Sequence, residues 1–290
     1  MILAAALYQL ISAHAEYDGQ DLILTKDVEI THPLGTLYAQ RAHLQQVKID
    51  EDMPFNHIEL QDQIHIHSEN AGRSFDLYSD SANGKIAADA LYTFQSLTFQ
   101  GNVDCKSCDS FRALSSGAHY QARPGQQGTL ELFPTCKLTF ADATLDCDGP
   151  LTLRLQENLA DTDNPLHYQD TFVRIEAQNG RLTYSREANH IEPQAIYCNG
   201  QVRLFSQENY ALADQLVYFP ETQTIHLFSE GSGRVLFWKS DGSIQISAPE
   251  VQARFDRKQQ KEEIQGIGDV HFTFDLDEES RIETLFGKYL

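Results

Sequence analysis

The chain has 290 residues, of which 41% are hydrophobic and 22% are charged. Its 42 acidic residues outnumber the 22 basic ones and leave a formal net charge of −20. A surface this acidic repels phosphate backbones and excludes nucleic acid as a partner, and the apolar content excludes a disordered acidic chain. We therefore expect a folded, acidic protein.

The N-terminus carries a short apolar run, residues 2–11, followed by Ser12-Ala13-His14-Ala15. The run is too short to span a bilayer, which takes about 20 apolar residues. It resembles the apolar region of a secretory signal peptide with cleavage after Ala15, although no Lys or Arg precedes Lys26. We predict that residues 1–15 are a signal peptide and that the protein is exported. An amphipathic or buried helix is the alternative.

From residue 16 onward, apolar and polar residues alternate with a period of two, which is typical of strands with one dry and one solvated face. Clear runs are Leu22-x-Leu24, Ile64-x-Ile66 and Leu151-x-Leu153-x-Leu155. Turn pairs such as Asn199-Gly200 separate these runs. Many short strands without helical crossovers predict an antiparallel all-β fold.

The strands recur as a loosely spaced repeat that contains Gly-x-Val, followed by Ala-Asp-x-hydrophobic-x-Tyr in its clearest copy. The valine position recurs at residues 28, 64, 103, 151, 202, 235 and 270, and Asp62 replaces the glycine in the second copy. The glycine permits a bulge or a turn with positive φ. One unit cannot bury its apolar face alone, so successive units must stack.

These copies divide the chain into four predicted parts. Residues 1–15 are the signal peptide, and residues 16–104 hold the N-terminal repeats. Residues 105–195 are divergent central repeats with insertions, and residues 196–290 hold the C-terminal repeats.

The five cysteines leave two readings open: Cys105, Cys108, Cys136, Cys147 and Cys198. Cys105-x-x-Cys108 has the spacing of a redox pair or half a zinc site, but no second such pair and no thioredoxin-like context accompany it. We expect plain thiols or a local disulfide, with up to two disulfides in an exported protein.

The repeated phrase resembles the OstA-like family, which includes the periplasmic lipopolysaccharide-transport protein LptA and the periplasmic domains of LptC and LptD. The resemblance rests on residues 211–219, 231–238, 246–256 and 266–274, with a weaker copy at 24–44. It implies an elongated antiparallel β-jellyroll or β-roll built from repeated strand pairs. It further implies that lipid A acyl chains lie in the apolar interior and that the ends join edge to edge with equivalent domains.

The alternation assigns one set of side chains to this lipid-binding interior, and a filled core is the alternative for the same set. The set is Val28, Ile30, Ile64, Ile66, Val202, Leu204, Leu216, Tyr218, Ile225, Leu227, Val235, Phe237, Ile244, Ile246, Val251, Phe255, Val270 and Phe272. Residues 204–205 and 235–238 are apolar on both faces and predict an additional outer contact surface.

The sequence contains no motif of a known active site. His65-x-His67 puts two imidazoles on one strand face, but the alternating Ile64 and Ile66 favour a solvated outer face over a metal pair. Asp146 and Asp148 are more typical of a turn than of a glycosidase pair. We therefore expect no enzyme activity, no cofactor and no metal.

The preferred hypothesis is a periplasmic carrier or bridge protein that binds the lipid A part of lipopolysaccharide and passes it to the outer membrane. Its expected partners are lipopolysaccharide and LptC-like and LptD-like domains, joined by edge-strand pairing, with homo-oligomers as a further outcome. The alternatives are an assembly module with a packed core and a polysaccharide hydrolase. The carrier hypothesis predicts that Phe237→Glu abolishes lipid binding without unfolding the roll.

Overall fold

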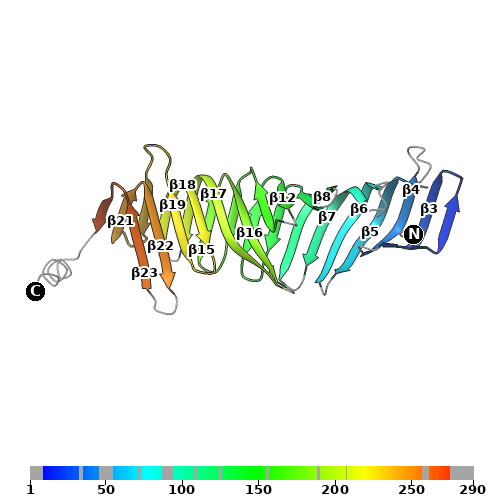
Figure 1. Cartoon of the computed structure of the whole chain (residues 1–290), viewed down its shortest axis with the longest axis horizontal. Coiled ribbons are helices and arrows are strands. Elements are labelled where there is room, and N and C mark those ends of the chain that lie inside the picture. Colours follow the sequence, from blue (N-terminus) through cyan, green and yellow to red (C-terminus); the bar gives the residue numbers. More distant parts are fainter. Residues whose placement is uncertain are drawn as a thin grey trace, which may run out of the picture. The chain divides into compact units, whose positions relative to one another are not determined.

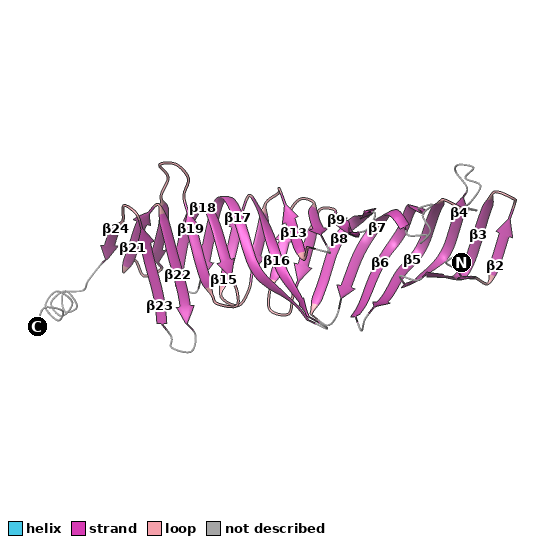
Figure 2. Cartoon of the chain, in the orientation of Figure 1, coloured by secondary structure: helices cyan, strands magenta, loops and turns pink. Residues whose placement is uncertain are grey.

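The computed structural model describes residues 9–32, 35–45, 55–70, 73–86, 94–107, 110–123, 126–154, 157–187, 190–206, 208–256 and 261–274. These residues form strands joined by turns and loops, as Figure 2 shows. None of them belongs to a helix long and apolar enough to cross a membrane. Every strand pair described below is antiparallel, which confirms the predicted all-β class.

The chain divides into two compact units: unit 1 comprises residues 1–164 and 183–193, and unit 2 comprises residues 165–182 and 194–290. Unit 1 holds β1 (Gln9–Ile11), β2 (His14–Tyr17), β3 (Asp21–His32), β4 (Gly35–Gln45), β5 (His57–Asn70), β6 (Arg73–Ile86), β7 (Phe94–Ser107), β8 (Phe111–Arg123), β9 (Gln126–Leu132), β10 (Cys136–Thr139), β11 (Thr144–Cys147), β12 (Leu151–Arg154) and β13 (Leu159–Thr162). Unit 2 holds β14 (Leu166–Gln169), β15 (Val173–Ala177), β18 (Asn209–Phe219), β19 (Thr224–Phe228), β20 (Val235–Lys239), β21 (Ile244–Ala248), β22 (Glu250–Asp256), β23 (Lys261–Ile267) and β24 (His271–Phe274). Strands β16 (Asn179–Glu187) and β17 (His190–Ser206) have residues in both units.

In unit 1, strands β3 to β9 form a meander in which each strand pairs with the next one along the chain (Figure 1). The two halves of a long strand have different outer neighbours. The first half of β3 pairs with β2 and its second half with β1. At the other end of the meander, the two halves of β8 pair with β10 and β9. All described strands belong to one continuous sheet, and the two halves of its long strands contribute to two parts of it, which we call two sheets.

The strands change sheet before four of the seven predicted valine positions, residues 28, 64, 103 and 202, whereas no pair of consecutive positive φ values precedes residues 151, 235 and 270. Gly200 and Gln201 have φ values of 75° and 47°, and Val202 follows directly. These two residues lie opposite the single Asp214 on β18, because the register shifts between Asn199 and Val202. The predicted bulge with positive φ is thereby confirmed, and it redirects the strand. The same pair of positive φ values occurs at residues 26–27, 62–63 and 101–102, although residues 26–27 and 62–63 contain no glycine.

Unit 2 also has two sheets. One contains β14, β15, the second half of β17, the first half of β18, β20, β21 and β24. The other contains the first half of β17, the second half of β18, β19, β22 and β23. Tyr168 of the first sheet meets Tyr218 of the second with ring centroids 6.1 Å apart. The dry faces of the two sheets therefore pack against each other.

The interior that results is almost wholly apolar. Among the described residues, the buried polar side chains are Ser79, Ser110, Ser115, Thr162 and Asn209, and all of them are uncharged. Leaving a charge unpaired in such an interior costs several kcal/mol, which is why the alternation keeps charged residues on the outer faces.

The start of the described chain is part of unit 1. Residues 9–15 of the expected signal peptide contribute to β1 and β2, and both strands pair with β3. Residues 1–8 lie outside the described residues.

Candidate functional site

Most of the side chains that the sequence assigns to the interior lie on its dry faces. Each of the following is at most 4% exposed: Val28, Ile30, Ile64, Val202, Leu204, Leu216, Tyr218, Ile225, Leu227, Val235, Phe237, Ile246 and Val251. Ile66, Ile244 and Phe255 are half-buried. Val270 and Phe272 differ from the others, since 38% and 51% of their surfaces are exposed.

Aromatic side chains fill the middle of unit 2. Tyr168 and Tyr218 have no exposed surface, and their hydroxyls donate to Asp170 Oδ2 at 3.2 and 2.8 Å. Burial, helped by the negative charge of Asp170, raises the pKa of Tyr168 far above its usual range. The other oxygen of Asp170 accepts the backbone N–H groups of Phe172 and Val173 at 2.7 and 2.9 Å. This part of the interior is therefore a packed core.

The interior of unit 2 opens at its last strands. Phe272 on β24 pairs in register with Ile246 on β21, so the two side chains share the dry face of their sheet. Ile246 is only 4% exposed, whereas Phe272, on the last described strand of this sheet, is 51% exposed. Val270 precedes this strand and Phe255 lies on β22 of the other sheet. These apolar side chains are partly exposed at this end of unit 2 except for Ile246, and we call the group the β24 opening.

The described cysteines are core thiols. Cys105, Cys136, Cys147 and Cys198 are all buried and unpaired by disulfides. Burial, and then the neighbouring Asp104 charge, raises the pKa of Cys105 to about 12, and burial does the same for Cys198. Cys136 and Cys147 face each other across β10 and β11. Cys108 lies outside the described residues, so the structure describes no Cys105–Cys108 pair.

An exposed apolar patch lies on unit 2 at the segment for which the sequence predicts an outer contact surface. Leu236 and Leu212 are 44% and 40% exposed on neighbouring strands. Trp238 stacks on Tyr210 with ring centroids 5.8 Å apart and planes inclined by 20°. A pocket of about 310 Å³ adjoins them, lined by β20, β21 and β24. The segment 235–238 is thus apolar on both faces because one face is core and the other is this exposed surface.

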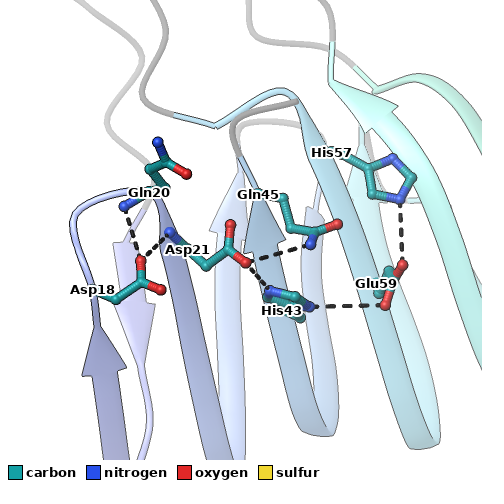
Figure 3. A network of polar contacts seen from close by, with 7 residues as sticks. All are labelled: Asp18, Gln20, Asp21, His43, Gln45, His57 and Glu59. Atoms are coloured by element: carbon teal, nitrogen blue, oxygen red, sulfur yellow. Dashed lines mark hydrogen bonds and ion pairs between the residues drawn. The ribbon is translucent and has the colours of Figure 1, made fainter. Parts of the chain in front are cut away.

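Histidine–carboxylate contacts occupy the outer face of unit 1. Figure 3 shows His43 on β4 between Asp21 on β3 and Glu59 on β5, with its Nε2 2.9 Å from Asp21 Oδ2 and its Nδ1 3.9 Å from Glu59 Oε2. His57 approaches the same Glu59 at 3.7 Å. The two nitrogens of His43 are directed to opposite sides, so this network bridges three strands without converging on one point.

A second histidine cluster does converge. His65 Nε2 and His67 Nδ1 lie 2.7 and 2.9 Å from the same oxygen, Asp76 Oδ1. Partial burial raises the pKa of Asp76, but hydrogen bonds from both histidines outweigh it and leave the pKa below its usual value. Both histidines are on the outer face, as the alternation predicts. The sequence does not single out Asp76 as a candidate site residue. No local pattern marks Asp76, because the pairing of β5 with β6 brings it there.

No protein-family model matches the chain, and no curated protein matches it. The fold and the chemistry of its faces are therefore the basis on which a function can be proposed.

Proposed function

We propose that the protein is a periplasmic carrier or bridge protein, similar to the OstA-like family, that binds the lipid A acyl chains of lipopolysaccharide and passes the lipid to the outer membrane. The observation that supports this proposal is the β24 opening, where an apolar interior reaches the surface through Phe272. Acyl chains are apolar and flexible, so their carrier needs an accessible apolar cleft more than placed catalytic groups.

Entry of the acyl chains takes place at the β24 opening in this proposal. Tyr168 and Tyr218 fill the part of the unit 2 interior where they meet, so a ligand cannot occupy that part without displacing them. Phe255 and Ile244 are already half-buried, and Phe272 is exposed, so contacts with an acyl chain there bury surface that is now in water.

Edge strands supply the contacts with neighbouring domains. β24 pairs with β21 and β23 with β22 in unit 2, while β1 and β2 both pair with β3 in unit 1. A strand at the end of a sheet can pair with a strand of another chain through its N–H and C=O groups. LptC-like and LptD-like domains, or a second copy of this chain, are the proposed partners at these edges.

An assembly module without a lipid ligand is the second candidate. It is favoured by the large side chains that are completely enclosed, among them Phe99, Tyr168, Tyr218 and Phe237. If these side chains never separate, the interior serves only as a core, and the edge strands carry the whole function.

Native mass spectrometry of the full chain with lipopolysaccharide separates the two candidates. The carrier proposal expects one bound lipopolysaccharide and no binding of the deacylated form, which keeps the sugars and phosphates. Phe272→Glu is expected to weaken binding about tenfold or more, because it places a charge where an acyl chain would bury an aromatic ring. Thr273→Glu, on the adjacent outward position of β24, is the matched control. Absence of binding to the wild type would leave the assembly module.

The position of Phe237 changes the choice of variant. Its side chain is 1% exposed, so Phe237→Glu would bury an unpaired carboxylate at a cost of several kcal/mol. We therefore expect this variant to unfold unit 2, in contrast to the sequence-based expectation that the roll stays folded.

A further inference from the structure

Three metal-binding side chains meet on the outer face of unit 1. His65, His67 and Asp76 each offer a ligand atom, and these atoms lie within 4.8 Å of one another. In the described part of the chain, this is the one group of three or more His, Cys, Asp or Glu side chains that meets this distance. The three side chains are 29%, 40% and 26% exposed, so an ion from solution can reach them.

The pairing of β5 with β6 accounts for this convergence. His65 and His67 are two residues apart and therefore point to the same face of β5. His67 lies directly opposite Asp76 on β6, and His65 lies opposite Tyr78. A strand pair of this kind holds its cross-strand side chains about 4.5–5.5 Å apart at Cβ, which is the spacing that allows both imidazoles to reach one carboxylate.

Aromatic stacking holds His65 in place. Its ring lies between Tyr78, with ring centroids 4.4 Å apart and planes inclined by 6°, and Tyr38, at 5.6 Å and 25°. Both partners are opposite His65 in register, one on each neighbouring strand. Packing, as well as its hydrogen bond, thus directs the Nε2 atom at Asp76. The side chain of His65 therefore loses little conformational entropy when an ion binds.

We propose that His65 Nε2, His67 Nδ1 and Asp76 Oδ1 form a binding site for a divalent transition-metal ion of the zinc class, with water completing its coordination. Bonds of about 2.0–2.2 Å to zinc separate the ligand atoms by about 3.3 Å, so the present 2.7 and 2.9 Å separations need only a small widening. The nitrogens that now donate to Asp76 become the ligand atoms, so on binding each neutral imidazole carries its single proton on the other ring nitrogen and presents a lone pair to the ion.

The ligand set selects the class of ion. Two imidazoles and one carboxylate suit Zn²⁺, Cu²⁺, Ni²⁺ and Fe²⁺, whereas Ca²⁺ and Mg²⁺ prefer oxygen ligands alone. The nearest cation in this row of side chains is Lys106, which lies opposite Asp76 on β7. Its ammonium group is paired with Asp104 at 3.3 Å and lies 5.2 Å from the Tyr78 ring centroid.

The network around His43 provides an internal comparison. It contains the same residue types, but His43 directs its two nitrogens to Asp21 and Glu59 on opposite strands (Figure 3). An ion at either nitrogen would have one imidazole and one carboxylate, which is a weaker site than three converging ligands. His43→Gln is therefore the matched control for substitutions in the proposed site.

Calorimetric titration with Zn²⁺ tests the proposal. The full chain is first freed of metal with a chelator and then dialysed. We expect one equivalent of Zn²⁺ to bind to the wild type and to His43→Gln with equal affinity. Asp76→Asn and His67→Gln should each weaken binding more than about 100-fold, since even outer-shell partners of a metal commonly contribute 10- to 100-fold. Circular dichroism of each variant establishes that its fold is retained, and His67→Gln, with the most exposed of the three side chains, serves if Asp76→Asn unfolds.

Cobalt provides a second readout that a change in stability does not mimic. Co²⁺ at this site should give a visible absorption band from its nitrogen and oxygen ligands, and the band should vanish in both site variants while remaining in His43→Gln. Lack of Zn²⁺ binding by the folded wild type, or equal binding by Asp76→Asn and His67→Gln, would overturn the proposal. The outcome is independent of lipid binding, because the site lies on the outer face of unit 1 and the β24 opening belongs to unit 2.

Discussion

Cys105 lies on β7 with none of its surface exposed, next in sequence to Asp104, whose carboxylate is paired with Arg112 at 2.8 Å. Burial of the thiol, and then this nearby negative charge, raises the pKa of Cys105 to about 12. Cys198 in unit 2 has the same pKa of about 12 from burial alone. Because the thiolate is the form that reacts, the reactivity of both residues reports directly on the packing around them.

Alkylation of Cys105 and Cys198 should therefore be negligible in the folded protein. At pH 8 the thiolate fraction of each is about a thousandfold lower than that of an ordinary thiol, and it increases with pH. Peptide mass mapping after iodoacetamide treatment measures each site separately. Both should react at the ordinary rate once a denaturant has unfolded the chain. Rapid alkylation of either residue under native conditions would contradict its burial.

At the scale of the single strand, a bulge with one extra residue redirects the chain before residues 28, 64, 103 and 202. Gly200 adopts a φ of 75°, and an added Cβ would lie 2.5 Å from Gln178 Oε1 and 3.0 Å from Gln178 Cβ. The backbone N–H of Gln178 also donates to Gly200 O at 3.0 Å. Glycine is thus required here both by its backbone conformation and by the close approach of the neighbouring segment.

Gly200→Ala should destabilise unit 2 by about 2–3 kcal/mol, because the left-handed conformation costs about 1–2 kcal/mol and Gln178 must also move. Gly242→Ala is the control, since Gly242 has a φ of 74° but no atom within 4 Å of its added Cβ. This control should lose only the conformational part, about 1 kcal/mol. Thermal and urea unfolding measure both. Equal losses would mean that the approach of Gln178 has no energetic effect.

At the scale of the whole molecule, exposed apolar side chains occur on the edge strands of each unit. Ile11 and Tyr17, on β1 and β2, are 46% and 65% exposed, and Phe272 on β24 is 51% exposed. Edge strands of stable monomers are commonly blocked by charges, prolines or covering loops. Exposed aromatic and aliphatic residues at these positions favour association with another chain.

We therefore expect the purified protein to self-associate as its concentration rises. Phe272→Lys should weaken this association about tenfold or more, because it puts a charge in place of an exposed aromatic ring that association would bury. Thr273→Lys changes charge equally at the next, outward-facing position and should have a smaller effect. Sedimentation velocity over a concentration series gives the association constants. A wild type that stays monomeric throughout would exclude pairing between copies of this chain.

The residues themselves determined the fold class and the orientation of most side chains. Alternation is a local property and does not depend on which strands pair. It therefore identifies Val28, Ile64, Val202 and Phe237 as buried from the sequence alone. The Gly-x-Val phrase likewise marked the bends at residues 101–102 and 200–201, where glycine adopts a positive φ, whereas the bends at residues 26–27 and 62–63 contain no glycine.

Tertiary structure alone decided which strand ends each sheet and which residues meet across strands. Phe272 follows the same alternation as Phe237 but is exposed, because β24 is the last of the described strands in its sheet. Asp76 reaches His65 and His67 only through the register of β5 with β6, and no spacing along the chain encodes that register. Local sequence fixes the face that a side chain occupies, whereas the summed energy of strand pairing selects its neighbours.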